Sequence, residues 1–184
     1  MQNFSEIQAL MKSDMEKTDE ILVDRLNSNV DLINQMSHYI IASGAKRLRP
    51  LLLLLSAIAT NYVGTDHHAM AVVIELIHTA TLLHDDVVDE STTRRGQDTA
   101  NELWGNAPSV LVGDFLYSRA FEIMVEPNSM AIMRILSKAT NQIAEGEVLQ
   151  LLNITNANVS QTEYFKVIEK KTACLFEAAC KICL

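Results

Sequence analysis

An apolar helical stretch of the sequence ends in three aspartates. It covers residues 74–96, IELIHTATLLHDDVVDESTTRRG, and its carboxylates are Asp85, Asp86 and Asp89. At roughly 100° of rotation per residue, Asp86 lies about 100° and Asp89 about 40° round from Asp85, so the three share one helical arc. Hard oxygen ligands, with neither Cys nor a tight His pair among them, suit Mg²⁺ with phosphate oxygens completing its shell. The cluster therefore predicts a metal-assisted diphosphate site.

The alternative interpretation of these aspartates is a solvated acidic helix end. Negative charge near a helix C-terminus is repelled by the carbonyl end, so three aspartates there without a cation would destabilise the helix. Two guanidinium groups, Arg94 and Arg95, follow the aspartates and could grip diphosphate oxygens in pairs. Both points favour the functional interpretation.

A second basic cluster lies upstream in the turn Gly44–Pro50, GAKRLRP. Its charged members are Lys46, Arg47 and Arg49. Such a string is often only a surface loop. If the helix that begins near Pro50 packs beside the aspartate helix, however, Lys46 and Arg49 can face Arg95 and His78 and hold a second diphosphate.

The two histidines of the apolar stretch are interpreted differently. His78 precedes Asp85 by seven residues, about two turns, and lies nearly on the same face. A lone His on an apolar helix is more often a core residue than a ligand, but this one looks towards the aspartates, which favours a phosphate-facing role. His84 is interpreted as structural.

Composition places the chain among helical globular domains. The 184 residues form one expected domain, 1–184, with 48% hydrophobic residues, 6 Gly and 3 Pro. Few aromatics and abundant Leu, Ile and Ala favour helices over strands. The net charge of −8 argues against general nucleic-acid binding, which needs a basic surface.

The three cysteines, Cys174, Cys180 and Cys183, fall in one apolar stretch. Core thiols are expected there, because the one C-x-x-C spacing has no second pair to complete a zinc site. An odd, clustered count also fits a reducing compartment. Residues 1–17 are amphipathic and partly acidic, unlike a signal peptide, and the apolar run 50–59 is too short to span a membrane. A cytoplasmic location follows as an expectation.

Apolar periodicity predicts helix after helix. The predicted segments are residues 5–28, 31–43 with a stop at Gly44, a central helix from Pro50 through 51–55, the aspartate helix after 62–66, and then 99–104, 109–125 and 129–152. After a polar linker, Ser160 and Glu163 form a capping box for the last helix, Thr162–Leu184. That helix has no stop signal, so the chain is expected to be an N-terminal portion that self-associates and has little or no synthase activity alone.

Six ordered motifs carry a family resemblance: GAKRLRP, ELIHTATLLHDDVVDE, RRG, GNAPSVLVGDFLYSRAFE, AEGEVLQL and EKKTACLFEAA. In this order and spacing the chain resembles the trans-isoprenyl (polyprenyl) diphosphate synthases, above all long-chain bacterial members of the octaprenyl type. The resemblance implies an all-α antiparallel bundle around a deep apolar cavity, and a homodimer.

The function implied by the resemblance is head-to-tail condensation of isopentenyl diphosphate onto an allylic diphosphate, giving a long all-trans polyprenyl diphosphate, a quinone side-chain precursor. Mg²⁺ would be held by the three aspartates. Arg94, Lys171 and Thr172 match positions that contact the allylic diphosphate. The isopentenyl diphosphate positions match Lys46, Arg49, His78 and Arg95. Glu147 and Gln150 fall in a cavity-wall motif and receive no role.

Product length is expected to depend on the helix below the aspartates. Ala80 and Thr81 precede Asp85 by about one turn, and both are small, so a tunnel would stay open there and the product would be long. Ile77 would form a lower wall. So long an apolar product also implies contact with a membrane surface at release.

The sequence departs from the family pattern in two places. Ala45 replaces a usual second Gly, and no second aspartate-rich motif follows the Lys171–Thr172 pair. The absence keeps a non-catalytic, diphosphate-binding subunit open as the alternative to an enzyme. A terpene cyclase is disfavoured, because it would not need the GAKRLRP turn.

Overall fold

The aspartate helix is the centre of the molecule. The computed structural model describes residues 4–44 and 46–183, and in it the apolar stretch forms α5, His67–Val88. Every residue from Met70 to Ile77 is buried, as expected of a helix that is apolar on all sides. Helices α2, α4, α7 and α10 all pack against it. The predicted packing of the Pro50 helix beside the aspartate helix is therefore confirmed.

The N-terminal helices differ slightly from prediction. The expected single helix over 5–28 is divided into α1, Phe4–Leu10, and α2, Lys12–Arg25. Between them Met11 leaves the helical conformation, with φ −94° and ψ 5°, and its side chain is fully buried. The break thus turns the chain so that Met11 enters the core.

The next two helices flank the basic turn. Helix α3, Asp31–Ala42, ends before Gly44, whose φ of 76° confirms the predicted glycine stop. Helix α4, Leu48–Ala59, begins two residues before Pro50, which its first turn tolerates because the missing N–H would have no partner there. The departure from the family pattern at Ala45 lies outside the described residues.

A hairpin that the sequence did not predict follows the aspartates. Strands β1, Thr93–Arg94, and β2, Gln97–Asp98, pair antiparallel around a two-residue turn. Arg95 and Gly96 both have positive φ, 55° and 80°, as a type I′ turn requires. Helices α6, Ala100–Trp104, and α7, Asn106–Val125, come next; α7 begins three residues earlier than predicted, with Pro108 inside its first turn.

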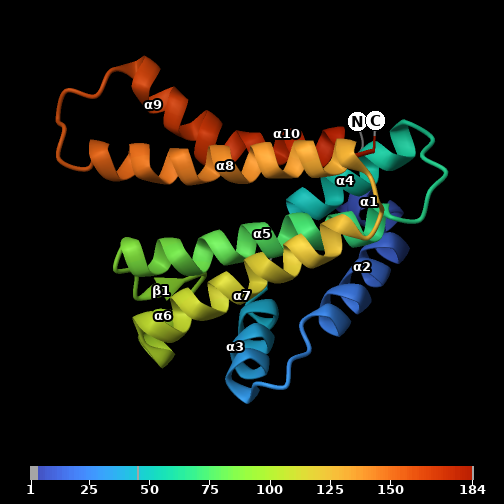
Figure 1. Cartoon of the computed structure of the whole chain (residues 1–184), viewed down its shortest axis with the longest axis horizontal. Coiled ribbons are helices and arrows are strands. Elements are labelled where there is room, and N and C mark those ends of the chain that lie inside the picture. The colour runs from blue at the N-terminus through green and yellow to red at the C-terminus, as the bar shows by residue number, and fades with distance from the viewer. Residues whose placement is uncertain (1–3, 45, 184) are drawn as a thin grey trace.

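The C-terminal helices form a second layer (Figure 1). Helix α8, Met130–Asn153, runs beside α9, Gln161–Ile168, and α10, Cys174–Lys181, while α5 and α7 form a neighbouring pair. The capping box of Ser160 and Glu163 is confirmed. The predicted last helix is present over residues 161–181, and a π-helical turn that the sequence did not predict, Glu169–Ala173, lies between α9 and α10.

The all-α class is confirmed, since the described strands are two residues each. Among the helices of residues 4–44 and 46–183, none is long and apolar enough to cross a membrane. The expected core thiols are also found. Cys174 and Cys183 are buried, Cys180 is half-buried, and all three are free.

Candidate functional site: the acidic end of α5

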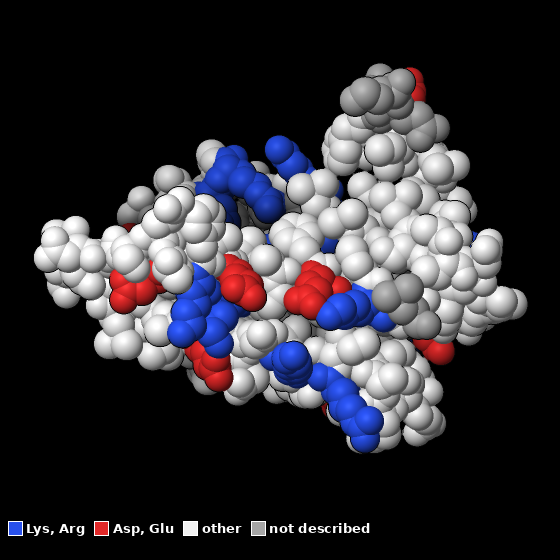
Figure 2. Space-filling view, turned by 90° about the horizontal axis from the view of Figure 1, so that it is seen from above, with Lys and Arg blue, Asp and Glu red and all other residues white. Residues whose placement is uncertain are grey.

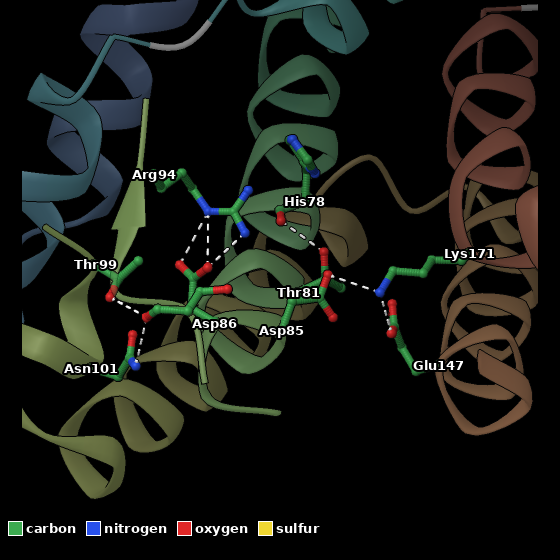
Figure 3. Close-up of polar contacts among 10 residues, drawn as sticks. His78, Thr81, Asp85, Asp86, Arg94, Thr99, Asn101, Glu147 and Lys171 are labelled. Atoms are coloured by element: carbon green, nitrogen blue, oxygen red, sulfur yellow. Dashed lines mark hydrogen bonds and ion pairs between the residues drawn. The ribbon is translucent and has the colours of Figure 1, made fainter. Parts of the chain in front are cut away.

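The aspartates do not act as one group in this structure. Side chains of Asp85 and Asp86 leave α5 in different directions and meet different cations, as Figure 3 shows. Asp89 caps the helix and is exposed. Within the described residues, the three carboxylates do not bring their oxygens within 4.8 Å of one another. Asp85 and Asp86 are each paired with a different cation, and their like charges repel.

Arg94 grips Asp86. Its Nη2 donates to Oδ1 at 2.6 Å and its Nε donates to Oδ1 at 3.0 Å, while the Asp86 side chain is only 5% exposed. The hydrogen bond from Arg94 to Asp86 raises the pKa of Arg94. Asp86 is therefore the least available of the three aspartates for another cation.

Local hydrogen bonds fix the hairpin that carries Arg94. The backbone N–H of Ser91 donates to the carbonyl of Asp86 at 2.9 Å. The Ser91 carbonyl in turn accepts from Thr99 Oγ1 at 2.7 Å and from Asn101 Nδ2 at 3.1 Å (Figure 3). This anchoring returns the chain to the end of α5, so that Arg94 faces Asp86 from eight residues away.

Lys171 bridges α5 and α8. Its Nζ lies 3.2 Å from Asp85 Oδ2 and donates to Glu147 Oε2 at 2.6 Å (Figure 3). Burial lowers the pKa of Lys171, but the hydrogen bond and charges of Glu147 and Asp85 outweigh it and the net shift is upward. Burial raises the pKa of Glu147 to about 7, with the Asp85 charge adding to it and Lys171 opposing. The protonation of Asp85, Glu147 and Lys171 is therefore linked, because each charge shifts the pKa of a neighbour.

The π-helical turn aims Lys171 at Asp85. A π turn adds one residue to the helical repeat and shifts the side chains that follow. Helix α8 approaches the turn so closely that a Cβ on Gly146 would lie 2.6 Å from the backbone N of Lys171. The glycine in the AEGEVLQL motif therefore permits this contact. Thr172, in the same turn, is exposed, and Gln150 is half-buried one turn beyond Glu147.

A second cationic group surrounds His78. Burial, together with the positive charges of Arg49, Arg95 and Arg94, lowers the pKa of His78 to about 3. The imidazole is therefore neutral at physiological pH. A pocket of about 70 Å³ beside it is lined by His78, Arg94, Arg95 and Asp86, and by apolar residues of α2 and α3.

Arg49 and Arg95 reach this region from different elements. The Arg49 guanidinium lies 4.3 Å from the centre of the Phe176 ring, and its Nε is buried without a partner. Arg95 donates to the Gly44 carbonyl at 2.8 Å, which ties the hairpin to the basic turn. Lys46 is exposed. The structure thus brings Arg49, Arg95 and His78 together as the sequence predicted.

Arg47 has a role that the sequence did not reveal. It adopts a left-handed conformation, φ 47°, immediately before α4. Its side chain is inside the protein, with Nε 3.0 Å from Asp19 Oδ1 and Nη1 3.5 Å from Glu75 Oε1. Glu75 stands out as an interruption of the apolar run, and that charge is the signal that could have predicted a buried partner.

The expected chain-length residues occupy different environments. Ala80 and Ile77 are fully buried in the core. Thr81 is half-buried, donates to the His78 carbonyl at 2.8 Å, and lies next to Asp85 in Figure 3.

Charged side chains of both signs also lie together on the surface. In Figure 2, Lys and Arg side chains lie among Asp and Glu side chains across the middle of the face seen from above, and most of the rest of that face is uncharged. The described chain thus combines local basic clusters with an overall net charge of −8.

The protein is therefore an all-α bundle whose central helix, α5, meets cationic side chains both at its aspartate-rich end and around His78. The polyprenyl synthetase family model matches residues 30–184, and the chain belongs to that family. It is 51% identical over 96% of its length to octaprenyl diphosphate synthase of Escherichia coli (strain K12), and 48% identical over 97% to that of Haemophilus influenzae. The chain spans about half the length of these relatives, 55% and 54%.

Solved structures of polyprenyl synthases also resemble this chain. A polyprenyl synthase from Caulobacter crescentus CB15, complexed with calcium and isoprenyl diphosphate, superposes with a TM-score of 0.93 at 47% identity. The match covers 96% of this chain and 54% of that one. A decaprenyl diphosphate synthase from Rhodobacter capsulatus also gives 0.93, at 43% identity, covering 97% of this chain and 55% of its own.

Proposed function

We propose that this chain forms part of a long-chain trans-polyprenyl diphosphate synthase, of the octaprenyl type, which condenses isopentenyl diphosphate with an allylic diphosphate. The observation that carries the proposal is that cationic side chains meet α5 at two levels, with Arg94 near both. Lys171 and Arg94 flank Asp85 and Asp86, while Arg49 and Arg95 surround His78 about 10 Å further down the helix. Two diphosphate substrates require two such places.

The residues present fit a divalent cation. Asp85 and Asp89 lie one turn apart on one arc of α5 and offer the hard oxygen donors that Mg²⁺ prefers. Bound there with the allylic diphosphate, Mg²⁺ would supply positive charge against the leaving group. For this to happen Lys171 must release Asp85, after which its ammonium is free to face the diphosphate. Asp86, already gripped by Arg94, would position that guanidinium instead.

The protein groups account for the rest of the reaction. As the allylic C–O bond breaks, negative charge grows on the diphosphate between Lys171, once it has released Asp85, and Arg94, and both cations stabilise that charge. The carbocation left behind is attacked by the alkene of isopentenyl diphosphate, held by Arg49, Arg95 and neutral His78. The new C–C bond forms and a proton passes to the departed diphosphate. Apolar walls exclude water, which would otherwise quench the cation.

Three further statements belong to the same proposal. The enzyme acts as a homodimer, supported by exposed apolar residues of α7 such as Leu111 and Phe121. It works in the cytoplasm, supported by the free thiols. Its product leaves at a membrane surface, because a long polyprenyl tail is poorly soluble in water. A non-catalytic subunit gains no support, since the relatives named above are synthases.

Calorimetric binding of each diphosphate to the 184-residue chain tests the proposal. Isopentenyl diphosphate should bind without Mg²⁺, and Arg95→Ala should weaken it at least about tenfold, because a charge-assisted hydrogen bond contributes about 1.5–3 kcal/mol. Allylic diphosphate should bind only with Mg²⁺ present, and Asp85→Asn should weaken this Mg²⁺-dependent binding. Arg134→Ala, at an exposed arginine of α8, is the matched control. Equal losses of both ligands in both variants would contradict two separate sites.

A further inference from the structure

A group of metal-ligating side chains lies at the opposite end of α5 from the aspartates. Asp14 of α2 and the adjacent His67 and His68 at the start of α5 bring one donor atom each within 4.8 Å of one another. Seventeen residues separate His68 from Asp85, about 26 Å along the helix. The group is therefore independent of the diphosphate sites.

The contacts within the group are close to those of a ligand set. His68 Nε2 lies 2.9 Å from Asp14 Oδ1, and the two imidazole rings have centroids 4.0 Å apart. The side chains of His68 and Asp14 are 13% and 30% exposed, so water can reach the group but does not surround it. Donors on one tetrahedral Zn²⁺ lie about 3.3 Å apart at bond lengths of about 2.0–2.1 Å. Small side-chain rotations would bring these three donors to that spacing.

His67 supplies an observation that the Asp14–His68 pair does not explain. Its Nδ1 is buried and makes no hydrogen bond of good geometry, although the Gly64 backbone lies within weak hydrogen-bonding reach of the ring. A buried nitrogen without a partner is costly unless something else meets its lone pair. Burial lowers the pKa of His67 and the neighbouring His68 contributes, while Asp14 and the Gly64 backbone oppose the shift.

One cation opposes metal binding here. Lys17, one turn after Asp14, is near enough to lower the pKa of His67. It is exposed, so its flexible ammonium can turn into solvent when another cation arrives. The Asp14 carboxylate supplies the opposite charge within the group.

We propose that Asp14, His67 and His68 form a Zn²⁺ site that links α2 to the N-terminal end of α5. Two imidazoles and one carboxylate match zinc rather than Mg²⁺ or Ca²⁺, which take oxygen ligands, and a water would complete the tetrahedron. Metal binding to the folded chain alone stabilises the fold, so the site acts as a clamp on the helix that carries the aspartates.

The test is a Zn²⁺ titration of the metal-free 184-residue chain with excess Mg²⁺ present to occupy carboxylate sites. We expect one equivalent of Zn²⁺ to bind and to raise the melting temperature, and Co²⁺ in its place to give the visible absorption of a tetrahedral N/O site. His67→Ala should weaken Zn²⁺ binding at least about tenfold. His38→Ala, at an exposed histidine of α3, and Asp85→Asn should leave it unchanged.

A further variant separates a metal site from an ordinary ion pair. In His68→Gln the side-chain amide can still donate a hydrogen bond to Asp14, but the imidazole donor is gone. We expect this variant to fold, by circular dichroism, and to lose the Zn²⁺-dependent rise in melting temperature. Zn²⁺ binding that survives in His68→Gln and His67→Ala, or is lost in Asp85→Asn, would overturn the proposal.

Discussion

At the scale of single residues, the environment of each charged group decides what it can do. Asp85 and Asp86 are neighbours in sequence, yet one meets an ammonium and the other a guanidinium fork. Their availability differs accordingly, because a bidentate arginine pair is harder to open than a single lysine contact. His78 is a third case, since nearby positive charge and burial keep it neutral.

The neutral state of His78 predicts an acid-sensitive fold. Its pKa, about 3 when folded, lies below the 6.5 of an unperturbed histidine. The unfolded chain therefore binds a proton that the folded chain does not, and stability present above pH 6.5 is lost as the pH falls towards 3. Between pH 7.5 and 4.5, His78→Gln should lose about 2 kcal/mol less than the wild type in urea unfolding. Equal pH slopes for wild type and His78→Gln would contradict this, and His38→Gln is the control.

The Arg47–Glu75 contact predicts a rescue. Glu75 is 7% exposed, and burial raises its pKa while Arg47 lowers it. Arg47→Met should cost about 3 kcal/mol of unfolding free energy, because it leaves a buried carboxylate unpaired. Adding Glu75→Leu should recover much of that loss. If the double variant is no more stable than Arg47→Met alone, the cost does not arise from leaving Glu75 unpaired, and loss of the Asp19 contact is the remaining charge effect.

At the scale of elements, the position of Lys171 depends on the contact between α8 and the π turn. Neither element places the lysine alone. The turn sets its direction and Gly146 sets how closely α8 approaches. A π turn is less favourable than a regular helix and persists where tertiary contacts compensate for it.

Two glycine substitutions test this contact. In Gly146→Ala the new methyl group meets backbone, 2.6 Å from the Lys171 N, and we expect a loss of about 1–3 kcal/mol together with weaker Mg²⁺-dependent binding of allylic diphosphate. In Gly113→Ala the methyl group would lie 2.4 Å from Nε2 of the His84 ring. This ring is half-exposed and can rotate away. Thermal unfolding should therefore show a smaller loss for Gly113→Ala. The reverse order would contradict the packing argument.

At the scale of the whole molecule, α5 links three places: the cluster at its start, the cations around His78, and the aspartates at its end. Because helices surround it for most of its length, a change at one level of α5 affects a defined level of the interior. In a synthase, the length of the product is the property that residues at different levels of α5 would control.

Thr81 is the position at which to test product length. It lies one turn before Asp85 on nearly the same face and is half-buried, so a larger ring there is not forced into the packed core. In an active synthase that contains these residues, Thr81→Phe should shorten the main product to about three or four isoprene units, since the ring sits only about 5.4 Å below the aspartate. Ala80→Tyr is the less informative variant, because Ala80 is fully buried and overpacking would also reduce stability. Unchanged long products from Thr81→Phe, separated by chromatography, would contradict the prediction.

Local sequence patterns predicted much of the secondary structure. Apolar periodicity, the glycine after α3 and the capping box of Ser160 and Glu163 act over a few residues, so they predicted the helical class and most helix boundaries. The hairpin at 93–98 and the π turn were missed. The hairpin is held in place by contacts of Arg94 with Asp86 and of Arg95 with Gly44, and the π turn packs against α8. Local patterns contain no information on such contacts.

The sequence by itself predicted an acidic end of the central helix and a basic turn before α4, because each is a continuous run of residues. Only the tertiary structure decided how the charged residues pair: Asp86 with Arg94, Asp85 with Lys171, and Arg47 with a buried glutamate. The two residues of these pairs are separated by 8, 86 and 28 positions in the sequence, respectively. Electrostatic attraction acts through space and burial strengthens it, so the partner of each charge depends on which helices pack together.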